Sequence, residues 1–237
     1  MTARARMAGA AGLALAGALA GMAAAGGAAA ATIVVNGSFE AGVPGDPAGL
    51  DNGLHFAALP ATGGGWDRWT ALDGWTTVAG PGIEVQTDRT LPGIDAQDGQ
   101  YYVELDSTAN AAMQQLVTLT PGSYALSFWY APRTASAATN RIEWWIGGLA
   151  AGSVTGAFSG MWTEVTALFA VTAPGTYALR FAAAGGSDSY GGLIDNVAIT
   201  PAPVPVPAGL PLLAGALALL PVLCRRRPGA GRAGGRD

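Results

Sequence analysis

The sequence predicts an all-β protein: an antiparallel β-sandwich of the jelly-roll type over residues 32–200, flanked by an N-terminal signal-peptide helix and a C-terminal transmembrane helix. Three observations predict the sandwich. Apolar side chains alternate with period two in several segments, turn dipeptides separate these segments, and residues 32–200 show no long 3.6-residue period. Gly (36) and Pro (15) are abundant, which favours short strands joined by turns.

The expected strands follow one another from residue 74 to residue 199. In residues 124–130 Tyr, Leu, Phe and Tyr face one way and Ala, Ser and Trp the other; residues 142–146 and 177–182 alternate likewise. Further strands are expected at residues 74–79, 83–86, 101–106, 112–118, 162–171 and 192–199. Turns are expected at Pro121-Gly122, Pro174-Gly175, Gly147-Gly148, Asp98-Gly99 and Gly185-Gly186. The longest expected loop is the Gly-rich stretch 41–65.

Charge is distributed unevenly along the chain. Residues 1–31 carry two arginines, residues 32–200 carry 5 Arg against 15 Asp or Glu, and residues 201–237 carry 5 Arg against one Asp. The middle is therefore an acidic domain between two basic, apolar ends. An acidic body argues against nucleic acid as a partner, and it is compatible with calcium, which prefers carboxylate and carbonyl oxygens.

The first 31 residues have the order of a secretory signal peptide. Arg4 and Arg6 precede an uncharged run over residues 7–22, and Ala29-Ala30-Ala31 supplies a cleavage site for signal peptidase. A buried Ala-rich helix is the alternative. The order of charge, apolar run and small residues favours the signal peptide, so the mature chain is expected to begin near Thr32.

The C-terminal end has the order of a membrane anchor. A Pro-rich linker over residues 201–207 leads into the uncharged run 208–224, which predicts a transmembrane helix. Arg225, Arg226 and Arg227 follow and predict a basic cytoplasmic tail over residues 225–237. A core helix of the domain is the alternative, which the prolines within the run disfavour.

This end resembles the VPLPA-CTERM variety of the PEP-CTERM sorting signal. The resemblance is carried by Val204, Pro205, Val206, Pro207 and Ala208, the apolar run and the Arg cluster; Val206 replaces the usual Leu, and ten residues follow the cluster. It implies export through the inner membrane of a Gram-negative bacterium. An exosortase-type transpeptidase would then process the tail, with the inner membrane as a transient anchor. The implied destination is the cell surface or the extracellular matrix of a biofilm.

Three motifs within the domain resemble the galactose-binding-like jelly rolls, which include carbohydrate-binding modules and DUF642-type domains. They are Asn36-Gly37-Ser38-Phe39-Glu40, Asp73-Gly74-Trp75 and Gly191-Gly192-Leu193-Ile194-Asp195-Asn196-Val197. The resemblance implies that the first and last strands lie side by side, and that Glu40 and Asp195 share one structural Ca²⁺. In the alternative, Glu40 caps a turn and Asp195 accepts backbone N–H bonds.

A saccharide site needs flat aromatic faces next to polar side chains. Trp129 and Trp145 are expected on the outer strand faces, the latter beside Arg141 and Glu143. Trp66 and Trp69 are expected in the Gly-rich loop. Core or lid positions are the alternative for each of these residues, and Trp75 and Trp162 are expected in the core because each begins a strand-like run.

The sequence predicts no enzyme. The only Cys is Cys224 in the apolar tail, the only His is His55, and no G-x-S-x-G motif surrounds a serine. A glycosidase carboxylate pair stays open, because the separation of two carboxylates is not visible in a sequence. Two functions remain: a non-catalytic module that binds exopolysaccharide or cell-surface glycan, and a purely structural matrix protein without a discrete ligand.

Overall fold

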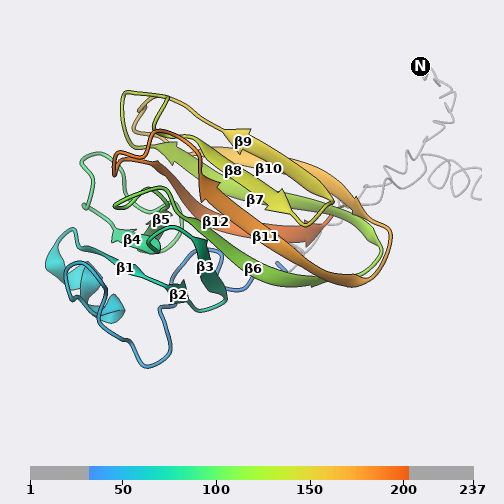
Figure 1. Cartoon of the computed structure of the whole chain (residues 1–237), viewed down its shortest axis with the longest axis horizontal. Coiled ribbons are helices and arrows are strands. Elements are labelled where there is room, and N and C mark those ends of the chain that lie inside the picture. The colour runs from blue at the N-terminus through green and yellow to red at the C-terminus, as the bar shows by residue number, and fades with distance from the viewer. Residues whose placement is uncertain (1–31, 203–237) are drawn as a thin grey trace, which may run out of the picture.

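The computed structural model describes residues 32–202 of the chain. Two six-stranded antiparallel sheets pack face to face (Figure 1), which confirms the predicted β-sandwich. The first sheet has the order β1 (Trp66–Trp69), β4 (Ile83–Thr87), β5 (Tyr101–Glu104), β12 (Gly192–Pro201), β7 (Gly122–Pro132) and β10 (Thr163–Val171). The second has the order β2 (Ala71–Leu72), β3 (Trp75–Ala79), β6 (Ala112–Leu119), β11 (Gly175–Ala183), β8 (Ile142–Ile146) and β9 (Ala150–Val154).

Every strand expected from the alternation is present, with bounds within two residues of those expected. Three strands were not expected: β1, β2 and β9. The stretch 41–65 is largely irregular, as predicted, but it contains a short 3-10 helix, η1 (Phe56–Thr62). The placement of Trp66 and Trp69 in a loop is wrong, because these two residues begin and end strand β1, which pairs with β4.

The core lies between the sheets and follows the period-two pattern. Leu126 and Phe128 of β7 point inward and are fully buried, while Trp129 points outward and is half-buried. The ring of Phe128 meets that of Phe181 from β11 at 5.0 Å, edge to face. Trp75 is fully buried, as predicted. Trp162 lies outside this core and packs instead against a small apolar cluster on the outer face of the first sheet.

The N-terminal segment of the domain runs beside the last strand. The Ile33 N–H donates to the Ile199 carbonyl at 2.9 Å, and the Val197 N–H donates to the Gly37 carbonyl at 2.9 Å. A side chain at residue 37 would place its Cβ 1.9 Å from the Val197 carbonyl oxygen, so only glycine permits this approach. The first and last segments are therefore neighbours, as the jelly-roll resemblance implies.

One end of the sandwich is built from two similar turns, and we call it the turn end. Pro121-Gly122 joins β6 to β7 and Pro174-Gly175 joins β10 to β11, so each turn crosses from one sheet to the other. In both, the tyrosine two residues after the glycine donates its hydroxyl back to the residue before the proline: Tyr124 to the Thr120 carbonyl at 2.9 Å, and Tyr177 to the Ala173 carbonyl at 2.7 Å. These bonds close the two corners.

The opposite end carries longer connections, and we call it the loop end. It comprises residues 105–111, 133–141, 155–162 and 184–191. Buried Asn140 organises this end: its amide nitrogen donates to the carbonyls of Thr134, Ser136 and Gly156 at 2.8–2.9 Å, and its oxygen accepts the Arg133 N–H at 3.1 Å. One buried side chain thus fixes the conformation of the β7–β8 loop.

No helix within residues 32–202 is long and apolar enough to cross a membrane. The predicted signal peptide, the sorting motif Val204 to Ala208, the transmembrane segment and Arg225, Arg226 and Arg227 all lie outside the described residues. The predictions for these segments stay predictions.

Candidate functional site

The candidate site begins with polar residues on two neighbouring strands. Ile83 and Val85 of β4 face the core, so Glu84 and Gln86 between them point to the outer face of the first sheet. In the antiparallel register Glu84 lies directly opposite Glu104 of β5. Side chains opposite each other in such a pair are about 5 Å apart at Cβ, so the two carboxylates are close neighbours.

The connection from β4 to β5 folds back over this outer face and buries it. Its residue Ile94 packs with Tyr102, Ala131 and Leu193, which are the outward-facing apolar residues of β5, β7 and β12. As a result Glu104 is completely buried, and Glu84 is only 4% exposed. The outer face of the first sheet, which solvent would otherwise cover, therefore holds a second, smaller apolar cluster, and Glu84 and Glu104 are buried on the same face.

Hydrogen bonds join the polar residues into one network. The Gln86 amide nitrogen donates to Glu84 Oε1 at 2.6 Å and to Glu104 Oε2 at 2.5 Å. Arg133, which follows β7, forms an ion pair with Glu104 Oε2. The Gly191 N–H donates to Glu104 Oε1 at 2.6 Å. Glu104 is therefore bonded on both oxygens, as a buried carboxylate must be.

Two carboxylates share one guanidinium in this network. Burial, together with the charge of the facing Glu84, raises the pKa of Glu104 to about 8, although Arg133 favours the ionised form. Burial raises the pKa of Glu84 as well. Burial and the facing carboxylates therefore favour retention of a proton by the pair near neutral pH, and Arg133 offsets the charge that remains. With Arg133 included, the network is then close to neutral.

A pocket of about 460 Å³ opens above the network, and we call it the Arg133 pocket. It is lined by Gly64, Trp66, Glu84, Gln86, Thr90, Leu91, Ser107, Thr108, Arg133, Ser189 and Tyr190. The Arg133 guanidinium lies over the Tyr190 ring, 4.7 Å from its centroid, and Tyr190 is 51% exposed. Gln86 Oε1 is buried without a hydrogen-bond partner among the described residues. The pocket thus combines two aromatic rings, both signs of charge and an unused acceptor.

A second hollow of about 440 Å³ adjoins this pocket. The two share Leu91, Arg133 and Tyr190, and Phe158, 45% exposed, lies on the far side of the second hollow. The stacked Arg133 and Tyr190 side chains therefore stand between a polar compartment and an apolar one. A ligand of more than one unit could occupy both.

The two carboxylates do not form a catalytic pair open to a substrate. Glu104 is fully buried and does not line the Arg133 pocket, and the Gln86 amide nitrogen bonds both Glu104 and Glu84. A glycosidase needs two carboxyl groups that both reach the scissile bond. Among the residues that line this pocket, Glu84 is the only carboxylate.

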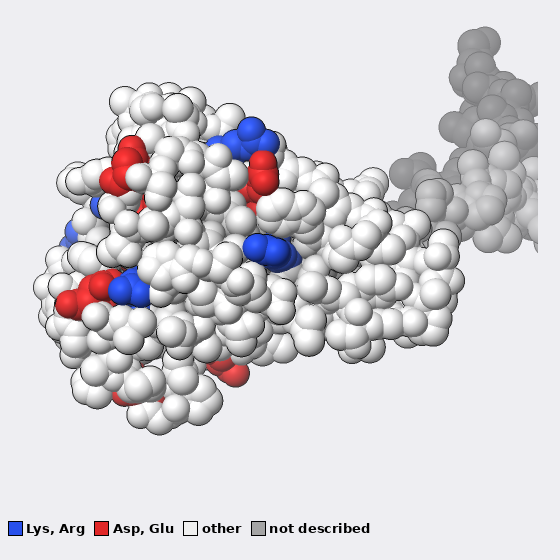
Figure 2. Space-filling model, viewed as in Figure 1, with Lys and Arg blue, Asp and Glu red and all other residues white. Residues whose placement is uncertain are grey.

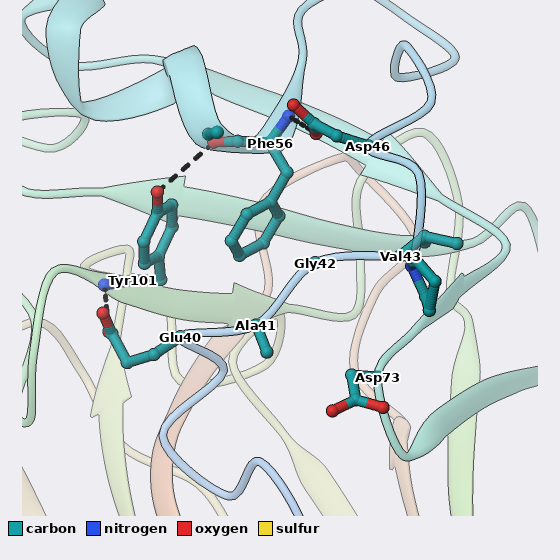
Figure 3. A pocket seen from close by; sticks show the side chains of 10 residues that line it. Glu40, Ala41, Gly42, Val43, Asp46, Phe56, Asp73 and Tyr101 are labelled. Carbon is teal, nitrogen blue, oxygen red and sulfur yellow. Dashed lines mark hydrogen bonds between the residues drawn. The ribbon is translucent and has the colours of Figure 1, made fainter.

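A pocket of about 420 Å³ lies beside Glu40 (Figure 3). Its carboxylates come from Glu40, Asp46 and Asp73, and its aromatic rings are Phe56 and Tyr101, which stack on each other at 4.4 Å. Both rings are buried, and the Tyr101 hydroxyl donates to the Phe56 carbonyl at 3.3 Å. This pocket offers neither an exposed aromatic face nor a cation, so it suits a saccharide less well than the Arg133 pocket.

Glu40 and Asp195, the predicted calcium ligands, both hold the segment 97–101. Glu40 Oε1 accepts the N–H groups of Gln100 and Tyr101 at 2.7 and 3.0 Å. Asp195 Oδ2 accepts those of Gln97 and Asp98 at 2.8 and 3.0 Å. Burial raises the pKa of Asp195 to about 7, against the effect of these N–H donors.

The contacts of these two carboxylates match the alternative in which they accept backbone N–H bonds. Calcium takes six to eight oxygen ligands, and N–H donors are not ligands. No group of three or more His, Cys, Asp or Glu residues that could hold a metal ion occurs within residues 32–202. The described side chains therefore fit a calcium ion poorly, although calcium itself stays a prediction.

The structure separates the other predicted ligand-binding residues. Trp66 lines the Arg133 pocket, whereas Trp69 is buried in the core and donates its indole N–H to the Pro47 carbonyl at 3.0 Å. Trp129 lies on the outer face of the first sheet. Trp145 lies on the outer face of the second sheet, under the Arg180 guanidinium at 5.6 Å. Arg141 and Glu143 form an exposed ion pair at 2.6 Å. These residues do not form one site.

Sequence reasoning missed Glu84, Gln86, Glu104, Arg133 and Tyr190. One signal was present: residues 83–87 alternate between apolar and polar, so a polar outer face could have been inferred for β4. The facing of Glu84 and Glu104 depends on strand register, and the approach of Arg133 and Tyr190 depends on two separate loops. Neither has a local signature.

Comparisons with known proteins find similar folds but no family. No protein-family model matches the chain, and no curated protein matches it. Among solved structures, TmCBM61 in complex with β-1,4-galactotriose is similar with a TM-score of 0.44 and 14% identity, over 73% of this chain and 99% of that chain. A family 35 carbohydrate-binding module from Clostridium thermocellum is similar with a TM-score of 0.38 and 20% identity, over 58% of this chain and 99% of that chain. The K1 cleaved adhesin domain of Lys-gingipain from Porphyromonas gingivalis W83 is similar with a TM-score of 0.41 and 17% identity, over 59% of this chain and 99% of that chain.

Proposed function

We propose that the protein is a non-catalytic module that binds a neutral saccharide in the Arg133 pocket. The observation that carries this proposal is the combination of a half-buried ring, Trp66, and an exposed ring, Tyr190, with a buried, nearly neutral polar network. A sugar ring presents an apolar face that packs on an aromatic side chain and hydroxyl groups that need donors and acceptors. Small-molecule sites generally combine such an apolar wall with a few placed polar groups.

Each part of the pocket has a counterpart in such a ligand. Trp66 and Tyr190 offer faces for the ring, and Arg133, Thr108 and Ser189 line the pocket with hydrogen-bonding groups. These polar groups favour a hydroxyl-bearing ligand over an apolar one.

The experiment is a retention assay of the full-length chain in detergent with neutral and acidic polysaccharides, including the exopolysaccharide of the producing cell. We expect retention on a neutral polysaccharide and about tenfold weaker binding by Trp66→Ala, a loss of ~1.4 kcal/mol. Trp145→Ala is the matched control, since it removes a half-buried indole from the opposite sheet. If Trp145→Ala abolishes retention and Trp66→Ala does not, the site lies on the second sheet. If no polysaccharide is retained, a purely structural role is favoured.

Delivery to the cell surface is part of the same proposal. The ordered signals at both ends of the sequence support cleavage by signal peptidase, transient anchoring in the inner membrane and processing by an exosortase-type enzyme. Replacing Pro205 and Pro207 by Ala should leave the unprocessed chain in the membrane fraction. Normal release of this variant would argue against the sorting signal.

Calcium remains a testable part of the proposal. An ion at Glu40 and Asp195 would offset the burial of Asp195 and tie the segment 97–101 to both ends of the chain. EDTA should then lower the Tm of the full-length chain, and added Ca²⁺ should restore it. An unchanged Tm would leave the N–H bonds of the two carboxylates as their whole role.

A further inference from the structure

The turn end of the domain carries no charge. No Asp, Glu, Lys or Arg occurs in the parts of the described chain that form it, residues 32–35, 117–126, 146–151, 168–178 and 197–202. Figure 2 shows the same segregation: the charged atoms gather over the half that contains β1, β4 and the loop end, and the other half is free of them. All 5 Arg and 15 acidic residues of the described chain thus lie away from the turn end.

This end is also apolar at its sides. Leu168 of β10 is 75% exposed on the outer face of the first sheet, and Leu116 of β6 is 65% exposed on that of the second. Leu116 lies five residues before Pro121, and Leu168 lies six residues before Pro174. A surface exposed to water on all sides ordinarily mixes charges of both signs, so this end has the composition of a surface that faces something other than bulk water.

The chain leaves the domain at this end. The Ala202 N–H donates to the Ser123 carbonyl at 2.8 Å, which holds the exit beside the β6–β7 corner. Only residues 203–207 separate this exit from the uncharged run 208–224 and its three arginines. Five or six residues reach at most ~20 Å even when fully extended. A bilayer that contains residues 208–224 would therefore lie within that distance of the turn end.

We propose that the turn end faces the surface of a lipid bilayer. The body of the domain has a net charge of −10, and phosphatidylglycerol headgroups give a bilayer surface a negative charge. Turning the acidic half toward that surface would be repulsive within a Debye length, about 8 Å at physiological salt. The uncharged end meets no such repulsion. This orientation sets the Arg133 pocket at the far end of β7, about 33 Å along the strand from the turn end at 3.3 Å per residue. The proposal rests on the proposed membrane anchor of residues 208–224 and not on saccharide binding.

Lipid quenching of labels at the two ends tests the orientation. The full-length chain with Cys224→Ser is given a single cysteine, either Ser123→Cys at the turn end or Ser136→Cys in the β7–β8 loop; both serines are exposed and neither side chain forms a hydrogen bond. Each variant is labelled with a fluorophore and reconstituted in vesicles of phosphatidylethanolamine and phosphatidylglycerol that contain a nitroxide lipid. We expect the label at residue 123 to be quenched several-fold more than the label at residue 136.

Three results would overturn the proposal: equal quenching at both positions, stronger quenching at residue 136, or none at either. Disulfide-linked pairs through residue 123 without quenching would show that a second copy covers this end instead. A charge variant separates contact from mere tethering. With the label at Ala173→Cys, adding Ser123→Asp should reduce quenching by phosphatidylglycerol vesicles, whereas Ser136→Asp should not. Equal quenching with and without the added charge would contradict contact with the headgroups.

Discussion

The loop end and the turn end of this sandwich are closed by different chemistry. At the turn end two Pro-Gly corners are each sealed by a tyrosine hydroxyl, Tyr124 and Tyr177, and no charge is present. At the loop end and on the outer face beside it, the connections are longer and Glu84, Glu104 and Arg133 are buried or nearly so. Short neutral turns close the sandwich at the turn end, so closure alone does not account for the buried charges beside the loop end. Buried, perturbed charges beside a pocket are typical of functional sites.

Removing the buried cation should have the largest effect. Arg133→Met leaves two buried carboxylates without a counter-charge, and breaking a buried pair costs about 3–5 kcal/mol. The free energy of unfolding at pH 7, measured with urea on the full-length chain, checks this value.

Arg141→Met is the matched control for that change. Arg141 pairs with Glu143 at 2.6 Å on an open strand face, where ion pairs are worth about 0–1 kcal/mol. Similar losses of unfolding free energy in Arg133→Met and Arg141→Met would show that the buried ion pair stabilises the fold no more than the exposed one.

The pH dependence of stability should follow from the raised pKa of Glu104. Its pKa is about 8 in the folded protein and near 4.5 when unfolded, so between these values the folded state holds a proton that the unfolded state has lost. The contribution of Glu104 to the free energy of unfolding should therefore be greatest below about pH 4.5 and should fall as the pH rises to 8. The slope is at most ~1.4 kcal/mol per pH unit, and the total is a few kcal/mol.

Unfolding midpoints at pH 5, 6, 7 and 8 measure this slope. Glu104→Gln should make it shallower, because the amide does not titrate. Part of the slope should remain, because the pKa of Asp195 is also raised, to about 7. An unchanged slope in Glu104→Gln would mean that the proton is held elsewhere.

The two corner tyrosines should give the smallest effects. Tyr124→Phe and Tyr177→Phe each remove a hydroxyl that bonds a carbonyl, which is worth about 0.5–1.5 kcal/mol. Tyr124 is the more buried of the two, so its replacement should cost more. Thermal unfolding of the two variants side by side is the measurement. A loss above about 3 kcal/mol for either would show that the turn end depends on a single bond.

The sequence predicted the fold where local pattern decides it. The alternation of β7, β8 and β11 reports the two sides of each strand directly, and their inward residues form the core. The pattern failed at β1, whose sequence is Trp-Asp-Arg-Trp. Asp67 is buried there because its carboxylate accepts the N–H groups of Asp51, Asn52 and Leu54. A buried charge satisfied by a distant loop has no signature in its own strand.

The candidate site was harder to predict for the same reason. The alternation placed Trp129 and Trp145 on outer faces, as found, but it could not tell that those faces belong to different sheets. Glu84 and Glu104 meet through register, and Arg133 is set in place by Asn140 seven residues later. Of the aromatic residues expected to bind a ligand, Trp66 is the one at the Arg133 pocket.

Strand β12 runs from the loop end to the turn end, so a force applied between these two ends would act along it. Ser189 and Tyr190, which line the Arg133 pocket, lie just before this strand, and Ala202 at the exit follows it. A polymer pulled through the pocket against a tether beyond Ala202 would stretch β12 along its own axis. Because β5 and β7 flank this strand, its ladder bonds are loaded in shear and must fail together rather than one after another. Under such a load, β12 would transmit the tension from the Arg133 pocket to the chain exit at Ala202.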